Sequence, residues 1–297
     1  MQGQIDELTA RLTPGARWTQ YPGFAHIQSY IQFIDNMLLG YGTMSSYYSS
    51  DNIATWQMHN TPLSGASILS ASLGNNLVLV AFYSTAGTPV SIIYSRPVND
   101  SSLWTSRVSV SNVRITSICH GGGTFVAVAD NGSIRSSTNG TTWTLRTTIS
   151  GANFTSVCYG RNKFVAVTND GRTYNSTNGT TWTLESTTSG AAFTSVCFGG
   201  ITFAAVTSTG QIYSGPNGHS WLLRTTVSGA NFASVCHGNG TFVAVASTGQ
   251  IYSSYGGTSW VMSLNNPDIN FSHVCHGNNM FIASSSNRLY TSHSLLL

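Results

Sequence analysis

Apolar and polar positions alternate along this chain in short runs, not over the length of a helix. In residues 154–187 the runs FTSVC, KFVAVT, RTYNS and TWTLE occupy residues 154–158, 163–168, 172–176 and 181–185. Asp-Gly and Asn-Gly separate the last three runs, and glycine accepts the positive φ that tight hairpin turns require. The pattern predicts four short antiparallel strands in this segment.

The same pattern recurs with a nearly constant period. The five cysteines, Cys119, Cys158, Cys197, Cys236 and Cys275, are each separated by 39 residues. The tryptophans Trp18, Trp56, Trp104, Trp143, Trp182, Trp221 and Trp260 lie 38, 48, 39, 39, 39 and 39 residues apart. Four antiparallel strands in about 40 residues are typical of one blade of a β-propeller. The sequence therefore predicts an all-β, seven-bladed β-propeller with four-stranded blades of about 39 residues.

The two ends of the repeat array complement each other. The last unit ends with the predicted strand in residues 287–294 and has no tryptophan strand of its own. Residues 13–21, TPGARWTQY, match the missing strand. We therefore expect the N-terminal strand to close the last blade, so that the propeller domain covers residues 13–297.

The first residues differ from the repeats. In residues 1–12, Ile5, Leu8 and Leu12 have helical spacing, which predicts a short N-terminal helical segment. Such a helix either caps one end of the ring or docks to a partner. Within a blade, small residues on the first strand predict a position near the axis, and aromatic residues on the last two strands predict a position farther out.

The composition restricts the environment and the partners. Only 7% of the residues are charged and the net charge is +3, so Ser, Thr, Asn and Gly must form most of the surface. This is typical of secreted or virion-surface β proteins, and it predicts a virion or extracellular location. No basic run favours nucleic-acid binding, and no apolar stretch is long enough for membrane insertion. Because the start MQGQIDELTARL lacks the features of a secretory signal, we expect release by lysis or by assembly into a particle.

The turn before each regular tryptophan carries a recognisable motif. SSTNGTTW, NSTNGTTW, SGPNGHSW and SSYGGTSW resemble the Asp-box, S-x-D-x-G-x-T-W, of sialidase-like BNR repeat propellers. The aspartate position of that family is occupied by Thr138, Thr177, Pro216 and Tyr255, whereas SSDNIATW keeps Asp51 but lacks the glycine. The resemblance implies a β-propeller, and because the box is a structural turn in that family, it implies nothing about chemistry. The uncharged repeats also resemble those of bacteriophage tail and adsorption proteins.

The sequence lacks the sets of residues that sialidases and other glycosidases need for catalysis. The sialidase resemblance implies three arginines around a carboxylate and a Tyr/Glu nucleophile pair, but the only glutamates are Glu7 and Glu185. Glycosidases more generally need two carboxylates at a controlled separation, whereas the nine acids here are scattered. We therefore predict no enzyme activity, no catalytic residues and no cofactor.

The cysteines have three interpretations: buried packing residues, disulfide partners or metal ligands. Their number is odd, and equivalent positions on successive inner strands are expected to lie too far apart for disulfides. His120, His237 and His276 each follow a cysteine, which raises a metal site as an alternative. Because Tyr159 and Phe198 stand at the equivalent positions and do not ligate in the same way, we predict buried, reduced thiols and no metal site.

Departures from the repeat mark the predicted binding residues. The 48-residue tryptophan gap and the irregular first unit place Tyr41, Tyr47, Tyr48, Tyr83 and Arg96 in the two divergent blades. The repeated tryptophans fit core packing better than sugar stacking. The outer-strand arginines Arg107, Arg146 and Arg224 fit charges on an exposed strand edge.

The sequence thus predicts a non-enzymatic structural or binding module, namely a bacteriophage tail or adsorption protein. The expected partners are other virion proteins, host surface glycans, or copies of the chain in a homo-oligomeric assembly. The alternatives are a free multivalent propeller lectin and a glycoside hydrolase of the sialidase type.

Overall fold

The computed structural model describes residues 18–21, 30–34, 37–41, 46–49, 57–59, 66–98, 104–286 and 288–293. Every regular element in these ranges is a β-strand, which confirms the all-β prediction. In the same ranges, no helix is long and apolar enough to cross a membrane. The helical segment predicted for residues 1–12 lies outside the described residues and stays a prediction.

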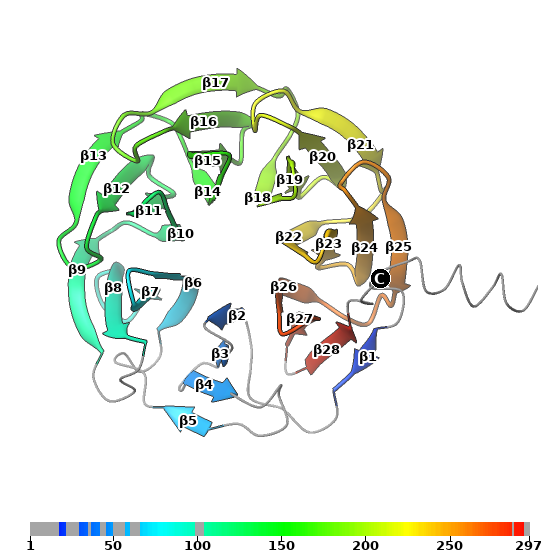
Figure 1. The fold of residues 1–297 in the computed structure, drawn as a ribbon, viewed down its shortest axis with the longest axis horizontal. Coiled ribbons are helices and arrows are strands. Elements are labelled where there is room, and N and C mark those ends of the chain that lie inside the picture. Colours follow the sequence, from blue (N-terminus) through cyan, green and yellow to red (C-terminus); the bar gives the residue numbers. More distant parts are fainter. Residues whose placement is uncertain are drawn as a thin grey trace, which may run out of the picture.

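The strands form seven antiparallel sheets of four strands each, arranged around one axis (Figure 1). Numbered in chain order, sheet 1 holds β2 (Tyr30–Ile34), β3 (Met37–Tyr41), β4 (Ser46–Ser49) and β5 (Gln57–His59). Sheet 2 holds β6 (Ser67–Gly74), β7 (Leu77–Ser84), β8 (Val90–Pro97) and β9 (Thr105–Ser111). Sheet 3 holds β10 (Ile115–Gly121), β11 (Thr124–Ala129), β12 (Ser133–Ser137) and β13 (Thr144–Thr148).

The remaining sheets repeat this plan. Sheet 4 holds β14 (Phe154–Gly160), β15 (Lys163–Thr168), β16 (Arg172–Ser176) and β17 (Thr183–Thr187). Sheet 5 holds β18 (Phe193–Gly199), β19 (Thr202–Thr207), β20 (Gln211–Gly215) and β21 (Leu222–Thr226). Sheet 6 holds β22 (Phe232–Gly238), β23 (Thr241–Ala246), β24 (Gln250–Tyr255) and β25 (Val261–Asn265). Sheet 7 combines β26 (Phe271–Gly277), β27 (Met280–Ser285) and β28 (Arg288–His293) with β1 (Thr19–Gln20).

In each regular sheet the chain runs from the axis outward. In sheet 4 the strands pair in the order β14-β15-β16-β17, and β14 lies nearest the axis in Figure 1. These strands match the four runs predicted from the sequence, except that Trp182 lies just before β17 and not within it. A register shift between Phe154 and Ser156 marks a bulge in the innermost strand.

The N-terminal strand lies in the same sheet as the C-terminal strands. β1 pairs with β28 through Thr19 opposite Thr291 and Gln20 opposite Tyr290. The amide of Tyr21 donates a hydrogen bond of 2.8 Å to the carbonyl oxygen of Leu289. This is the pairing that the missing tryptophan strand predicted.

The core lies between neighbouring sheets and not within one of them. The ten largest fully buried side chains are all phenylalanines, and they come from the two inner strands of the sheets. The expected gradient from small inner to aromatic outer residues is therefore wrong for these positions. The reason is the pleat: the first residue of an inner strand, such as Phe154, points into the space between two sheets, where it contacts Tyr174 at 5.4 Å between ring centroids.

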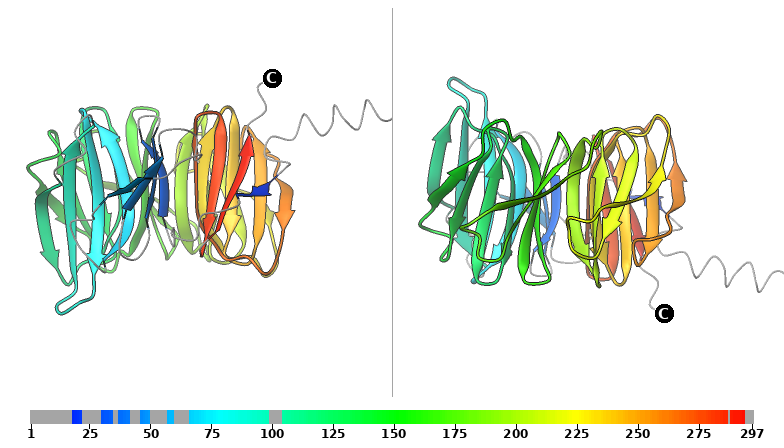
Figure 2. Two further views of the ribbon diagram at one scale, coloured as in Figure 1. Left: turned by 90° about the horizontal axis from the view of Figure 1, so that it is seen from below. Right: turned by 90° about the horizontal axis from the view of Figure 1, so that it is seen from above.

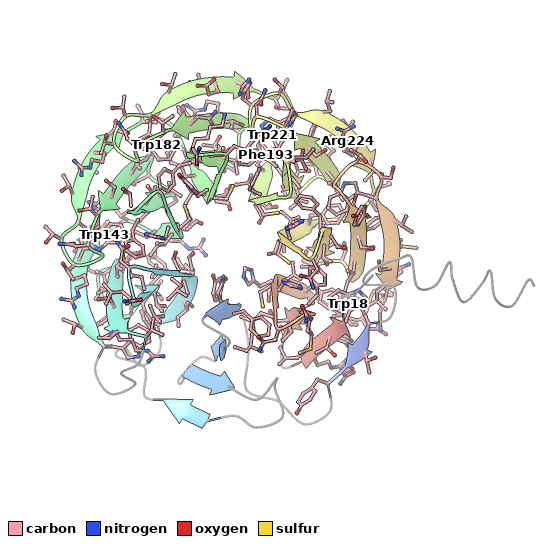
Figure 3. All side chains as sticks on the ribbon, in the orientation of Figure 1. Trp18, Trp143, Trp182, Phe193, Trp221 and Arg224 are labelled. Carbon is pink, nitrogen blue, oxygen red and sulfur yellow. The ribbon has the colours of Figure 1, made fainter. Side chains whose placement is uncertain are left out.

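Six tryptophans lie in the described residues, at the outer margin of these inter-sheet cores: Trp18, Trp104, Trp143, Trp182, Trp221 and Trp260. They are half-buried and pack on buried phenylalanines, as Trp221 does on Phe193 with 5.7 Å between ring centroids (Figure 3). Trp143 contacts Phe125 in the same way at 6.4 Å. The indole faces therefore take part in packing between sheets.

The turn before Trp143 shows how this chain builds its Asp-box-like motif. The amide of Gly140 donates to Ser137 Oγ at 2.8 Å, and the amides of Thr141 and Thr142 both donate to Asn139 Oδ1 at 2.9 Å. Gly140 has a φ of +70°, which favours glycine. Asn139 thus supplies the oxygen that caps the turn, one residue after the position at which the resembling family has its aspartate.

Candidate functional site

Repeated side-chain hydrogen bonds join the inner strands of neighbouring sheets. In each case a serine Oγ accepts from a backbone amide of the next sheet, which would otherwise lack a partner at the channel edge. The pairs are Ser70 with Ile118 at 2.9 Å, Ser117 with Val157 and Ser156 with Val196 at 3.2 Å, and Ser195 with Val235 and Ser234 with Val274 at 3.3 Å. These bonds hold the inner strands at fixed spacing around the axis.

The serine position changes where sheets 7 and 1 meet. His273 replaces the serine in β26, and Tyr30 replaces it in β2, where its hydroxyl accepts from the amide of Ala71 at 3.0 Å. The two rings stack with 4.3 Å between centroids, and His273 Nδ1 lies 3.1 Å from Ser234 Oγ. Burial lowers the pKa of His273 to about 4 and raises the pKa of Tyr30 to about 12. Both side chains are therefore uncharged at neutral pH.

The inner strands of all seven sheets line one central cavity of about 720 Å³. Its described walls contain all five cysteines, four histidines and the serines just described. Arg114 is the only arginine or lysine among the described lining residues, and none of them is a carboxylate. The cavity is thus a largely uncharged channel through the ring.

A circle of seven side chains, six of them rings, lines one end of this channel; we call it the collar. Six of its members follow the same position of each inner strand: Phe33, His120, Tyr159, Phe198, His237 and His276. Leu73 occupies the seventh position, in β6. The collar lies at the end of the ring that carries the turns between the first and second strands of each sheet.

Glycines of the neighbouring sheet hold the collar rings in place. Tyr159 packs flat against Gly121, where an added Cβ would come within 2.0 Å of its ring. Phe198 packs in the same way on Gly160, with a corresponding distance of 2.1 Å. Five of the rings also contact a phenylalanine of their own sheet, as Tyr159 does Phe164 with 4.8 Å between ring centroids, whereas Phe33 pairs with Leu38. Sequence reasoning weighed the histidines as metal ligands and missed the collar, although the recurring Cys-ring-Gly triplet marks it.

The imidazoles of the collar are uncharged near neutral pH. Burial lowers the pKa of His120 and His237 below its ordinary value. Burial, together with the neighbouring His237, lowers the pKa of His276. In the described residues, no group of three or more His, Cys, Asp or Glu side chains is placed to hold a metal ion.

The thiols lie one position further into the channel. All five cysteines are free; Cys275 is buried and the others are half-buried. Burial raises the pKa of all five thiols, and a neighbouring thiol adds to this effect at Cys119, Cys197 and Cys236.

Thiol titration of the denatured protein is expected to count five free thiols. In the folded protein at pH 7.5 we expect reaction at least about tenfold slower than in the denatured chain, because the thiolate is the reactive form and burial disfavours it. A count below five without added reductant, or equal rates in both states, would contradict this prediction.

The predicted binding residues do not converge on one place. Tyr41 ends β3, and Tyr47 and Tyr48 lie in β4; their side chains are outside the described part. Tyr83 pairs with Ser91, whereas Arg96 pairs with Val78 near the other end of the same two strands. Arg96 is only 6% exposed, and its guanidinium lies 5.3 Å from the ring centroid of Trp104. The structure therefore separates Arg96 from Tyr83.

The arginine that lies beside Tyr83 is Arg114, which the sequence did not single out. Its guanidinium lies over the Tyr83 ring at 5.9 Å from the centroid. Both lie at the base of the β7–β8 hairpin, whose strands of eight residues exceed the six and five of their counterparts in sheet 4. The hairpin projects beyond the other turns (Figure 2). We call this end of the ring the hairpin face; it is opposite the collar.

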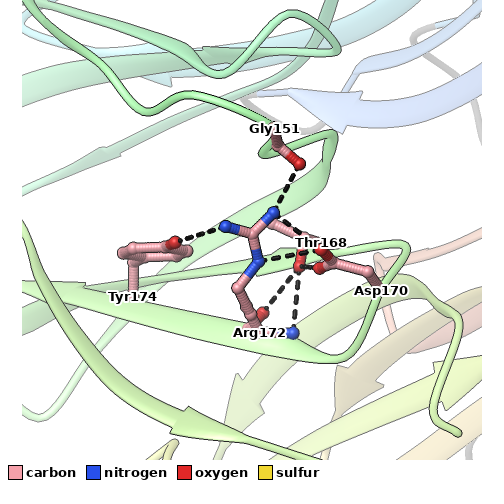
Figure 4. A network of polar contacts seen from close by, with 5 residues as sticks. All are labelled: Gly151, Thr168, Asp170, Arg172 and Tyr174. Atoms are coloured by element: carbon pink, nitrogen blue, oxygen red, sulfur yellow. Dashed lines mark hydrogen bonds and ion pairs between the residues drawn. The ribbon is translucent and has the colours of Figure 1, made fainter.

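A charged network lies at the same end of sheet 4 (Figure 4). Arg172 pairs with Asp170 at 2.6 Å and also donates to the hydroxyl of Tyr174 and the carbonyl oxygen of Gly151. Burial tends to raise the pKa of Asp170, but the hydrogen bonds and charge of Arg172 and the hydroxyl of Thr168 lower it overall. This is the only ion pair among the described residues, and it ties two turns of the hairpin face together.

Comparison with solved structures identifies the architecture. YCF48 bound to D1 peptide superposes with a TM-score of 0.69 and 16% identity over 93% of this chain and 94% of that one. The WD40 β-propeller domain of Doa1 superposes with a TM-score of 0.70 and 14% identity, covering 94% and 96% of the two chains. The fold is a β-propeller. A chain from the mitotic checkpoint complex is similar to this propeller as well, with a TM-score of 0.69, 12% identity and 95% coverage of both chains.

These similarities confirm the predicted β-propeller. At identities of 12% to 16% they are evidence for the fold and not for a shared function. No protein-family model matches the sequence, and no curated protein matches it.

Proposed function

We propose that this propeller is a non-enzymatic binding module of a bacteriophage tail or adsorption apparatus, in which seven sheets form one ring closed by β1. The observation that carries the proposal is the projecting β7–β8 hairpin with Tyr83 and Arg114 at its base. An aromatic ring beside a guanidinium, on a hairpin of small polar residues, suits polar recognition of a host glycan or a neighbouring virion protein.

Two further observations support this proposal. The 7% of charged residues and the Ser/Thr/Asn/Gly-rich turns fit a protein that acts outside a cell. Among similar propellers, the YCF48 structure contains a bound D1 peptide and another belongs to the mitotic checkpoint complex, which supports protein partners in general.

The double variant Tyr83→Ser, Arg114→Asn tests the hairpin face. Asn stands at the position of Arg114 in three regular sheets, as Asn153, Asn231 and Asn270, so the change restores a residue that the fold already accepts. On a glycan array and in crosslinking to the other tail proteins, we expect the wild-type protein to bind and the variant to bind at least about tenfold less.

Ile201→Ser, at the opposite end of the ring, serves as the control and should leave binding unchanged. Equal binding by the double variant would contradict the proposed face. A stoichiometry near five glycans per chain would favour a multivalent lectin that uses the regular sheets. Release of free sugar from a bound glycan would favour a glycoside hydrolase instead.

A further inference from the structure

A polar contact that other sheets share is replaced in sheet 4. In sheets 2, 3 and 5 the Nε atom of an arginine in the outermost strand donates to a serine Oγ of the neighbouring strand at 2.7 Å. The pairs are Arg107 with Ser95, Arg146 with Ser136, and Arg224 with Ser214. In sheet 6 the same two positions hold Ser263 and Ser253, whose hydroxyls lie 2.7 Å apart. Sheet 4 has Glu185 and Asn175 there, so an acid and an amide replace the usual pair.

A third residue of sheet 4 departs from the repeat at the same place. Lys163, the only lysine of the chain, begins β15. The first residue of the corresponding strand in sheets 3, 5 and 6 is a threonine: Thr124, Thr202 and Thr241. Lys163, Asn175 and Glu185 lie on three adjacent strands, β15, β16 and β17. Three exchanges within one sheet therefore bring an amine, an amide and a carboxylate onto neighbouring strands.

The amine and the amide are in contact. The carboxamide of Asn175 satisfies both of its neighbours in one orientation: its nitrogen donates to the carbonyl oxygen of Tyr174 at 3.1 Å, and its oxygen accepts from Lys163 Nζ at 3.2 Å. Asn175 is buried, as are Tyr174 and Ser176 beside it, so the amide is held in place. A fixed contact between an amine and a carbonyl group makes their reaction intramolecular, which removes the entropic cost of bringing them together.

The charges around Lys163 favour a reactive amine. Partial burial lowers the pKa of Lys163, the charge of Glu185 opposes this, and Arg161 adds to it, so that the pKa is lowered overall. A lower pKa leaves more of the amine unprotonated, and the unprotonated amine is the nucleophile. In sheet 3, the residue at the position of Glu185 is Arg146, which reaches the serine that Asn175 replaces. A carboxylate at this position is therefore placed to move protons at the amide.

We propose that Lys163 and Asn175 form an intramolecular isopeptide bond, with Glu185 as the proton carrier. The lone pair of the unprotonated Lys163 Nζ attacks Cγ of Asn175 and forms the new N–C bond, while the bond from Cγ to the amide nitrogen breaks. Glu185 accepts the proton that Nζ loses and passes it to the leaving nitrogen, which departs as ammonia. The step needs no oxidant, reductant or co-reactant, and each chain reacts once with itself.

The product ties β15 to β16 covalently within sheet 4. Nothing in the role proposed for Tyr83 and Arg114 depends on this bond. The Tyr83→Ser, Arg114→Asn variant should form it as the wild-type protein does, so the failure of one proposal is distinguishable from the failure of the other.

Peptide mapping tests for the bond directly. Trypsin cuts the unlinked chain after Arg161, Lys163, Arg172 and Arg224, which leaves Lys163 and Asn175 in separate peptides. After a week at pH 8 and 37 °C, we expect the wild-type protein to yield residues 162–172 joined to residues 173–224, with no cut at Lys163. The mass should be about 17 Da, one ammonia, below the sum of the two peptides, and fragment ions should place the junction between Lys163 and Asn175. If only separate peptides are found, the proposal is wrong.

Two variants exclude another source of the same mass change. A succinimide at Asn178–Gly179 also loses ammonia within residues 173–224, but it joins no second peptide. Lys163→Thr and Asn175→Ser introduce residues that other sheets have at these positions, so the fold already accepts them. Neither variant should give the linked peptide. A 17 Da loss that is the same in Lys163→Thr and in the wild-type protein, without a linked peptide, belongs to the succinimide and overturns the proposal.

Glu185→Gln tests the proton carrier. The glutamine keeps the size of the side chain but does not accept the proton, so we expect the linked peptide to form at least tenfold more slowly than in the wild-type protein. Asp268→Asn removes an exposed carboxylate elsewhere on the ring and should leave the rate unchanged. Circular dichroism of each variant checks that it is folded. Equal rates in the wild-type protein and folded Glu185→Gln would contradict the role of Glu185.

Discussion

Removal of residues 1–21 is expected to lower the free energy of unfolding by about 3 kcal/mol or more, since that is the usual loss when a packed tryptophan alone is deleted. Trp18 packs on the inter-sheet core that contains Val243 and Phe271. The truncation also removes the pairing of β1 with β28 and the hydrogen bond from Tyr21 to Leu289, which leaves the edge of β28 open.

Removal of residues 1–17 is the matched control. It keeps Trp18, β1 and Tyr21, so the difference between the two truncations isolates the contacts of residues 18–21. Urea or thermal unfolding of both proteins measures this difference. If the two truncated proteins unfold at the same midpoint, β1 does not close the ring in solution.

Acidification is expected to destabilise the protein between about pH 6.5 and pH 4, largely through His273. Above pH 6.5 the imidazole is neutral in both states. As the pH falls below 6.5, His273 becomes protonated in the unfolded chain but stays neutral in the folded protein, because burial lowers its pKa there to about 4. A difference of this size is worth roughly 3 kcal/mol, and the loss is complete near pH 4. The lowered pKa values of His120, His237 and His276 act in the same direction.

His273→Ser separates this effect from general acid denaturation. Serine stands at the same position in the inner strands of sheets 2 to 6, so the variant is a substitution that the repeat already contains. We expect it to lose stacking on Tyr30 but to show a smaller drop in melting temperature from pH 7.5 to pH 4.5 than the wild-type protein. His219→Thr, which restores the threonine found at this position in three other turns, as Thr141, Thr180 and Thr258, should leave the drop unchanged. The same drop in all three proteins would contradict the assignment to His273.

Some features of the fold follow directly from neighbouring residues along the chain. The strand positions of sheet 4 agree with the runs read from residues 154–187, because apolar alternation and turn glycines act over a few residues. The constant 39-residue period extends that agreement from one unit to the next. The N-terminal strand was found for the same reason: the array lacked one strand, and residues 13–21 matched it.

Other features depend on how side chains from different sheets meet. Tyr159 rests on Gly121 and His273 stacks on Tyr30, although the latter pair is far apart in the sequence. Arg114, and not Arg96, lies over Tyr83, because positions near the two ends of β7 and β8 project to opposite ends of the ring.

The sequence by itself therefore determined the all-β repeat, its strands and the closing strand, since these depend on local pattern and period. Only the tertiary structure decided the collar, the uncharged channel behind it and the partner of Tyr83. Those features arise where inner strands of successive sheets approach one another. The distances between these strands depend on how all seven sheets pack around the axis. A residue such as His237 has the same local sequence context whether it ligates a metal, fills a core or lines a channel. Its position on Gly199 of the neighbouring sheet distinguishes these roles.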